Sequence, residues 1–125
     1  MKNLLSLSVL LLTVACSSLK MKDNSYNGTW ILQKQSGGFA GRTATPEKET
    51  KLVIKKDKMF SYEDGTLIAE SAFNVEKGKV IQSSEPQDII VNNKLMKQSI
   101  AVSGDTLIIA DQCYDCFTYT YLRKK

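Results

Sequence analysis

The stretch YNGTWILQK, residues 26–34, contains Trp30, the only tryptophan in this chain of 125 residues. Trp30 and Leu32 lie on the same side of an extended chain, because side chains alternate between the two faces of a β-strand. Gly28 stands two residues before the tryptophan, where the missing side chain allows another part of the chain to approach closely. The stretch therefore predicts the first strand of the folded part, with Trp30 on its buried face.

The same alternation with period two continues to the end of the chain. Glycine and aspartate, as in Asp64-Gly65 and Ser103-Gly104-Asp105, separate the alternating segments and tolerate the backbone of tight turns. No segment carries a convincing helical stripe of ten residues. The eight predicted strands are 29–35, 51–56, 58–64, 66–76, 78–84, 94–103, 105–111 and 116–124.

The alternation also predicts which side chains of each strand share a face. Leu52 shares a face with Ile54, and Phe60 shares a face with Tyr62. Two longer runs place together Leu67, Ala69, Ser71, Phe73 and Val75, and then Phe117, Tyr119, Tyr121 and Arg123. An antiparallel meander of eight strands leaves two unpaired edges unless it closes. We therefore predict an all-β fold, an antiparallel up-and-down barrel of eight strands, with an open sandwich as the alternative.

Closure of such a barrel brings the two ends of the folded part together. The last strand then pairs antiparallel with the first, so that Arg123 lies beside Trp30. A guanidinium stacked over an indole ring contributes about 0.5–2 kcal/mol through a cation–π contact. We predict that this pair seals one end of the barrel.

Gly28, Trp30 and Arg123 resemble the signature of the lipocalin superfamily, in which Gly-x-Trp lies on the first strand and an arginine on the last. The stretches GTW, GGFAG and CFTYTYLRK resemble, more narrowly, the small lipocalin-like lipoproteins of Bacteroidota. The resemblance implies a lipocalin-like barrel over residues 28–125 and a structural role for the three signature residues. It also implies that the loop after the first strand folds over the open mouth, with Phe39 as a lid residue. An inert surface loop is the alternative.

Residues 1–16, MKNLLSLSVLLLTVAC, have the features of a targeting segment. Lys2 supplies a positive start, and the apolar stretch that follows is too short to span a bilayer comfortably. The segment resembles a bacterial lipoprotein signal peptide. That resemblance implies removal of residues 1–15 and attachment of diacylglycerol to Cys16, usually with an N-linked acyl chain such as palmitate. An ordinary secretory signal cut after Ala15 is the alternative.

The following residues, 16–27, are polar and lack periodicity, so we expect a flexible tether. Ser17 follows the cysteine in place of the aspartate that retains some lipoproteins in the inner membrane. The resemblance therefore implies a lipid-anchored protein of the cell envelope, placed in the outer membrane and facing the periplasm or the cell surface.

The stretch CYDC holds Cys113 and Cys116, for which three interpretations compete. A thioredoxin-like redox pair needs a strand followed by a helix, which the pattern here does not predict. A zinc site needs further cysteine or histidine ligands, and a chain without histidine does not supply them once Cys16 is acylated. A local disulfide fits an oxidising compartment and is favoured, with free buried thiols as the alternative.

The absence of histidine removes the commonest general base, which excludes Ser–His, Cys–His and His–zinc chemistry within the chain. The alternation places Glu63, Glu70 and Glu76 mostly outward, so no inward pair of carboxylates is expected for acid–base catalysis. The formal charge is +4, and the lysines are scattered rather than arranged in a basic stripe. We expect no enzyme activity, no metal or cofactor, and no nucleic-acid partner.

Inward phenols in an otherwise apolar interior are typical of a site that orients a small amphipathic ligand. The predicted pocket lining is Phe60, Tyr62, Phe73 and Tyr119, with Phe39 as the lid. We therefore expect non-covalent binding of a small hydrophobic molecule inside the barrel. The alternative is an envelope module whose barrel is filled by side chains and whose outer surface binds a partner protein.

Overall fold

Ten β-strands account for most of the residues that the computed structural model describes, which are 26–38, 41–91 and 97–125. The strands are β1 (Gly28–Gly37), β2 (Arg42–Ala44), β3 (Thr50–Lys55), β4 (Lys58–Glu63), β5 (Thr66–Ala72), β6 (Asn74–Gly78), β7 (Gln87–Val91), β8 (Gln98–Ser103), β9 (Thr106–Asp111) and β10 (Phe117–Arg123). They form one antiparallel sheet in the order β5-β4-β3-β1-β10-β9-β8-β7-β6, and β2 pairs with the end of β1. The predicted all-β, antiparallel, up-and-down arrangement is therefore present.

The first and last strands of the chain lie side by side in the middle of this sheet. Trp30 of β1 pairs with Arg123 of β10, and Gly37 pairs with Phe117 at the other end of the same ladder. A bulge near Gln33 shifts the register between these two points. The predicted pairing of the terminal strands is confirmed. We call the two ends of the sheet the Trp30 end and the Gly37 end.

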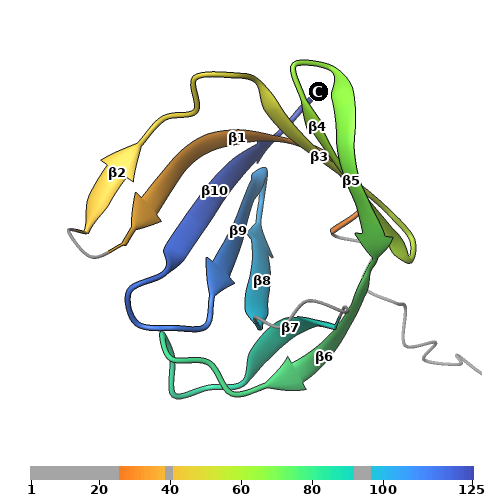
Figure 1. The fold of residues 1–125 in the computed structure, drawn as a ribbon. Coiled ribbons are helices and arrows are strands. Elements are labelled where there is room, and N and C mark those ends of the chain that lie inside the picture. Colours follow the sequence, from red (N-terminus) through yellow and green to blue (C-terminus); the bar gives the residue numbers. More distant parts are fainter. Residues whose placement is uncertain (1–25, 39–40, 92–96) are drawn as a thin grey trace, which may run out of the picture.

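The strands at the two ends of the hydrogen-bonding order, β5 and β6, are consecutive in the chain and are separated only by Phe73. The Phe73 amide donates to the carbonyl of Asp57 over 2.7 Å, which extends the β4–β5 ladder by one residue. After Phe73 the chain pairs with β7 instead of β4. The sheet curls, and β5 leads directly into β6 (Figure 1). The predicted single strand 66–76 is thus two strands with different partners.

The predicted strand 78–84 was wrong, because only its first residue, Gly78, belongs to a strand. Gly78 pairs with Gln87, so β6 ends at Gly78 and its partner β7 begins just after Pro86. Pro86 itself has no amide hydrogen to donate to a ladder. The intervening segment is held by side chains rather than by a ladder. The Ile81 amide donates to the Gln112 side chain over 2.9 Å. The strands β2 and β7 were not predicted.

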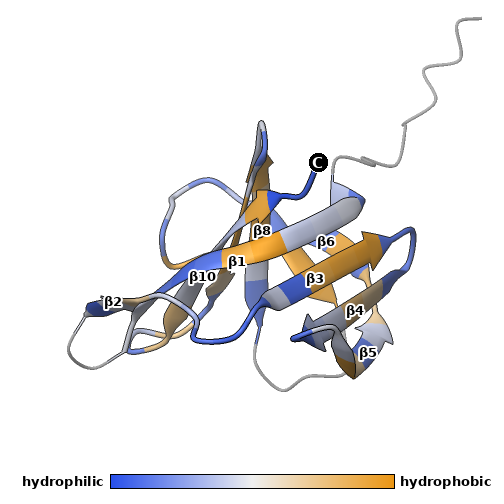
Figure 2. Ribbon diagram, turned by 90° about the horizontal axis from the view of Figure 1, so that it is seen from above, coloured by the Kyte–Doolittle hydropathy of each residue, from blue (hydrophilic) through white to orange (hydrophobic). Residues whose placement is uncertain are grey.

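The hydrophobic core lies on the inner face of the curled sheet and draws on both halves of the hydrogen-bonding order. Its buried members are Tyr26, Trp30, Leu52, Ile54, Met59, Phe73, Ile90, Ile100, Leu107 and Ile109. Hydrophobic residues colour the central parts of β1 and β3 in Figure 2. The alternation predicted the buried positions of β1 and β3, since Trp30, Leu32, Leu52 and Ile54 are all buried.

The Trp30 end is closed by stacked and hydrogen-bonded side chains. The Arg123 guanidinium carbon lies 4.2 Å from the centre of the Trp30 ring, which is fully buried. Arg123 also donates to the carbonyl of Asn27 over 2.9 Å, and the Trp30 indole donates to the carbonyl of Tyr26 over 2.9 Å. A β-carbon at Gly28 would lie 2.6 Å from the guanidinium, and the backbone φ of +147° is one that other residues rarely adopt, so this position favours glycine. The stacked pair predicted from the sequence is present.

Tyr26 completes this end by filling the space ahead of the first strand. Its ring meets that of Phe73 edge-on at 5.9 Å, and its hydroxyl donates to the carboxylate of Asp88. Lys77 also contacts that carboxylate, over 2.8 Å. Burial raises the pKa of Asp88, but the hydrogen bonds from Lys77 and Tyr26 and the charge of Lys77 outweigh it, so the pKa lies below its ordinary value. The sequence analysis did not identify this cluster.

Candidate ligand-binding site

Aromatic side chains of β10 line the inner face between the core and the Gly37 end. Tyr121 pairs with Leu32 and Leu107, and Tyr119 pairs with Ile109, so both tyrosines point to the same side as the core. Both are partly buried and pack against the core. The ring of Phe117 lies 6.4 Å from that of Tyr119. The predicted common face of these aromatic residues is confirmed.

The surroundings of the two phenols raise their pKa values. Burial raises the pKa of Tyr121 to about 12, and neighbouring Tyr119 adds to the shift. Burial also raises the pKa of Tyr119, with a further contribution from the charge of Asp111. Within the described part of the chain, neither hydroxyl has a hydrogen-bond partner. Both hydroxyls can therefore donate to, or accept from, a molecule placed on this face.

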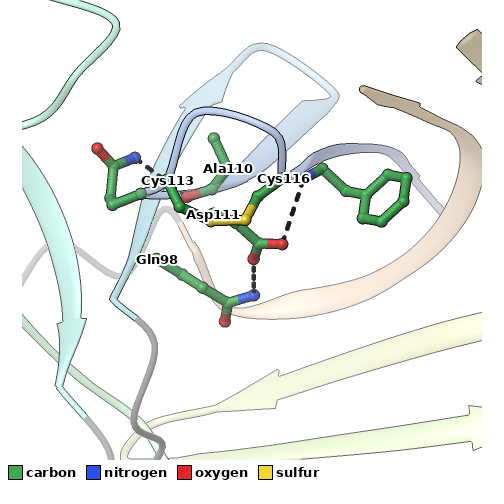
Figure 3. The surroundings of a disulfide bond; sticks show 7 residues. Gln98, Ala110, Asp111, Cys113 and Cys116 are labelled. Atoms are coloured by element: carbon green, nitrogen blue, oxygen red, sulfur yellow. Dashed lines mark hydrogen bonds between the residues drawn. A yellow bond between two sulfur atoms is a disulfide. The ribbon is translucent and has the colours of Figure 1, made fainter. Parts of the chain in front are cut away.

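A buried carboxylate lies beside the aromatic residues at the Gly37 end. Asp111, the last residue of β9, is 8% exposed and pairs with Gln98 across the ladder. The Gln98 amide donates to one carboxylate oxygen over 2.8 Å, and the Phe117 amide donates to the other over 3.4 Å. Figure 3 shows the carboxylate between these two donors. Leu107, Ile109 and Asp111 alternate in the sequence, so their shared face could have been predicted.

The Cys113–Cys116 disulfide is present and closes the turn between β9 and β10. This turn packs against the glycines that end β1. The Gly38 amide donates to the carbonyl of Cys116 over 3.2 Å, and a β-carbon at Gly37 would lie 2.2 Å from that carbonyl oxygen. The disulfide turn therefore fixes the base of the loop that follows β1, next to Asp111 and Phe117.

Two predicted pocket residues, Phe60 and Tyr62, point to the wrong side of the sheet. The register between β3 and β4 pairs Ile54 with Met59, whereas Phe60 pairs with Val53. Met59 therefore shares the inner face with Ile54, and the two aromatic residues of β4 lie on the outer face. Met59 and Phe60 are adjacent in the sequence and both are apolar, so the local pattern did not decide which of the two faces inward.

The remaining predicted residues are divided between the core, the inner face and undescribed parts of the chain. Phe73 is buried in the core against Tyr26, away from the Gly37 end. Tyr119 is the predicted pocket residue that lies beside Asp111. Phe39 and Cys16 fall outside the described residues. The structure thus brings together Tyr119 with Tyr121, Phe117, Asp111 and Gln98, of which Asp111 and Gln98 were missed.

A solvent-open hollow of about 420 Å³ lies elsewhere, where β4 begins and β5 ends. It is lined by Asp57, Lys58, Glu70, Ser71 and Ala72. None of the predicted pocket residues lines it. Its open walls carry charged side chains and no aromatic ring, so they do not match the half-buried aromatic surface on the inner face, and we do not place the ligand site there.

Across residues 26–38, 41–91 and 97–125, no three His, Cys, Asp or Glu side chains are grouped closely enough to hold a metal ion. In the same part of the chain, no helix is both long and apolar enough to cross a membrane. No protein-family model, curated protein or solved structure matches this chain.

Proposed function

We propose that this protein binds a small, mainly hydrophobic molecule non-covalently on the inner face of its sheet, near the Gly37 end. The observation that carries the proposal is the pair of half-buried phenols, Tyr119 and Tyr121, which have no protein partner among the described residues. Buried polar groups are normally hydrogen-bonded, so such hydroxyls favour a ligand or water as their partner.

Each residue of the proposed site has a distinct role. The rings of Phe117 and Tyr119 contact the apolar body of the ligand. The two phenol hydroxyls orient its polar group, and Asp111 accepts from a donor on the ligand while Gln98 holds the carboxylate in place. None of these groups is a nucleophile activated by a base, so the proposal is binding without catalysis and without a cofactor.

We further propose that the fold is an eight-stranded barrel of the lipocalin-like type. Counting β5 and β6 as one strand bent at Phe73, and leaving out the short β2, gives eight strands around the ring. The stacking of Arg123 on Trp30 beside Gly28 supports the same assignment.

We propose that residues 1–15 are a signal peptide and that Cys16 carries the lipid anchor. The protein then belongs to the cell envelope, held in the outer membrane and facing the periplasm or the cell surface. The disulfide between Cys113 and Cys116 supports an oxidising compartment. The mass of the N-terminal peptide of protein isolated from its own cells tests the anchor directly, because acylation of Cys16 adds the mass of the lipid.

A second candidate function is an envelope interaction module without a ligand. The observation that favours it is the dense core on the inner face, where Trp30, Ile54, Ile100 and Leu107 are all fully buried and leave little room. The two functions differ at the Gly37 end, where the binder requires a space beside Tyr119 and the module requires none.

Native mass spectrometry of protein purified from its own envelope tests the binder, since a bound small molecule adds a defined mass. Displacement of a fluorescent apolar probe by membrane extracts provides the affinity. Tyr121→Phe removes one hydroxyl and weakens displacement by roughly fivefold, the effect of about 1 kcal/mol of hydrogen bonding. Tyr114→Phe is the matched control, because Tyr114 is 91% exposed on the disulfide turn. Equal affinities of the two variants, or no displacement by any extract, would reject the site.

A further inference from the structure

The outer face of the β10-β1-β3-β4-β5 half of the sheet carries an apolar surface that the proposed ligand site does not use. The register places Leu122 beside Ile31, and Tyr62 beside Leu67, on this face. Val53 and Phe60 lie beside each other in the neighbouring row. Leu67 and Leu122 are 48% and 43% exposed. We call these six residues the outer apolar face: Ile31, Val53, Phe60, Tyr62, Leu67 and Leu122.

Lysines border the outer apolar face along β3 and at the β3–β4 hairpin. Lys51 lies over the Tyr62 ring at 4.8 Å from its centre. Lys55 and Lys58 are direct cross-strand neighbours at the hairpin end, and Lys56 occupies the turn between them. Like charges placed directly opposite each other destabilise a sheet, so this pairing concentrates positive charge at a cost to stability.

Acidic groups neutralise only part of this charge. Glu70 lies 3.7 Å from Lys58, and Asp57 occupies the same turn as Lys56. Lys34 also lies on the outer side of the sheet, since it pairs with Thr120 rather than with a core-facing residue. The hairpin therefore carries three lysines, Lys55, Lys56 and Lys58, against the two carboxylates, and Lys34 and Lys51 lie farther along the face.

The lysine-bearing hairpin lies beside the point where the N-terminal segment joins the sheet. The Lys56 amide donates to the side chain of Asn27 over 3.0 Å. Cys16 precedes Tyr26 by ten residues (26 − 16), which span at most about 35 Å when extended. This step rests on the proposed anchor at Cys16. An anchor there would keep the hairpin within reach of the bilayer surface.

We propose that the outer apolar face, with its lysine border, docks on a membrane surface that carries anionic lipids. Aromatic rings favour the interfacial layer of a bilayer, and lysines extend their charged ends toward lipid phosphates. A second copy of the chain would present the same excess of positive charge, so charge complementarity favours the anionic surface over self-association.

The test uses the mature chain from residue 16 with Cys16→Ser, which cannot be acylated and retains all the described strands. Binding is measured by co-sedimentation with vesicles of phosphatidylcholine alone and of phosphatidylcholine with phosphatidylglycerol in a 7:3 ratio. We expect the protein to bind the anionic vesicles, and we expect 0.5 M salt to abolish this binding. Lys55→Glu with Lys58→Glu lowers it by at least roughly 25-fold, about fivefold for each lysine lost.

The matched control is Lys79→Glu with Lys97→Glu, which makes the same change in net charge at exposed positions away from the face. Retained binding of this control supports docking through the hairpin. An equal loss in both double variants, or equal binding to both vesicle types, overturns it. So does a dimer that Leu67→Ser dissociates, because the face would then be occupied by a second copy. Acylation of Cys16 is read separately by mass, so failure of the anchor and failure of the face are distinguishable.

Discussion

Replacing Arg123 by alanine tests the closure of the Trp30 end. The substitution removes a cation–π contact at 4.2 Å, worth about 0.5–2 kcal/mol, and a hydrogen bond to a carbonyl, worth about 1.5–3 kcal/mol for a charged donor. The Arg123 side chain is 29% exposed, which favours the lower halves of these ranges. We therefore expect a loss of about 2–3.5 kcal/mol in the free energy of unfolding.

Urea unfolding followed by fluorescence measures this loss, because Trp30 is the only tryptophan and is fully buried. For a small domain the expected change moves the midpoint down by about 1–2 M. Arg123→Lys keeps the charge but loses the planar stacking surface, so it should recover only part of the stability. Circular dichroism provides a second signal that does not depend on the environment of the indole.

Gly28→Ala completes the test by pushing the guanidinium away without removing it. The added β-carbon would lie 2.6 Å from the guanidinium nitrogen, and the backbone at Gly28 has a φ of +147°. In the Arg123→Ala background only the backbone strain at Gly28 remains. The double variant should therefore lose about 1–2 kcal/mol less free energy of unfolding than the sum of the losses in the two single variants. Gly104→Ala is the control, since its β-carbon meets nothing within 4 Å. Strict additivity of Gly28→Ala and Arg123→Ala would refute the argument.

Three further predictions concern titration and the disulfide turn. Tyr121→Phe removes a group whose pKa is raised to about 12 in the folded protein. As the pH rises from 10 to 12, the native protein should therefore lose up to about 2.7 kcal/mol more free energy of unfolding than this variant. Urea unfolding at each pH measures the difference. The pKa of Asp88 is lowered in the folded protein, so its carboxylate stabilises the fold at pH values above the unfolded pKa of 3.8. This stabilisation is lost as the pH falls through the folded pKa. The free energy of unfolding of Asp88→Asn should therefore approach that of the native protein in acid. Gly37→Ala collides with the Cys116 carbonyl at 2.2 Å and should lower the melting temperature well below that of Gly41→Ala, whose β-carbon meets nothing.

The sequence predicted those parts of the fold in which alternation and chemistry agree. Lys51 and Lys55 flank the apolar run of β3 on the face opposite to Leu52 and Ile54, so the sequence indicated which face is buried. Trp30 and Arg123 have matching chemistry at opposite ends of the folded chain, which indicated the pairing of β1 with β10 before any contact was known.

The missed features depend on interactions between distant segments. Both faces of β4 carry an apolar residue, Met59 on one and Phe60 on the other. Only the register of β4 with β3 places Met59 inward. Phe73 continues the alternation of its run, and the change of strand partner there follows from the position of β7. The cluster of Tyr26 with Asp88 joins residues 62 positions apart, for which the sequence carries no local signal.

The pairing of β1 with β10 sets the order in which this domain can become stable. A chain emerging from the ribosome presents β1 first, yet one side of that strand stays without its hydrogen-bonding partner until β10, the final strand of the sheet, is free. Residues 30 and 123 must meet across almost the whole sequence, and contacts of such separation form slowly. The nascent chain therefore remains incompletely folded until β10 has been synthesised, which leaves a long interval in which chaperones can bind it.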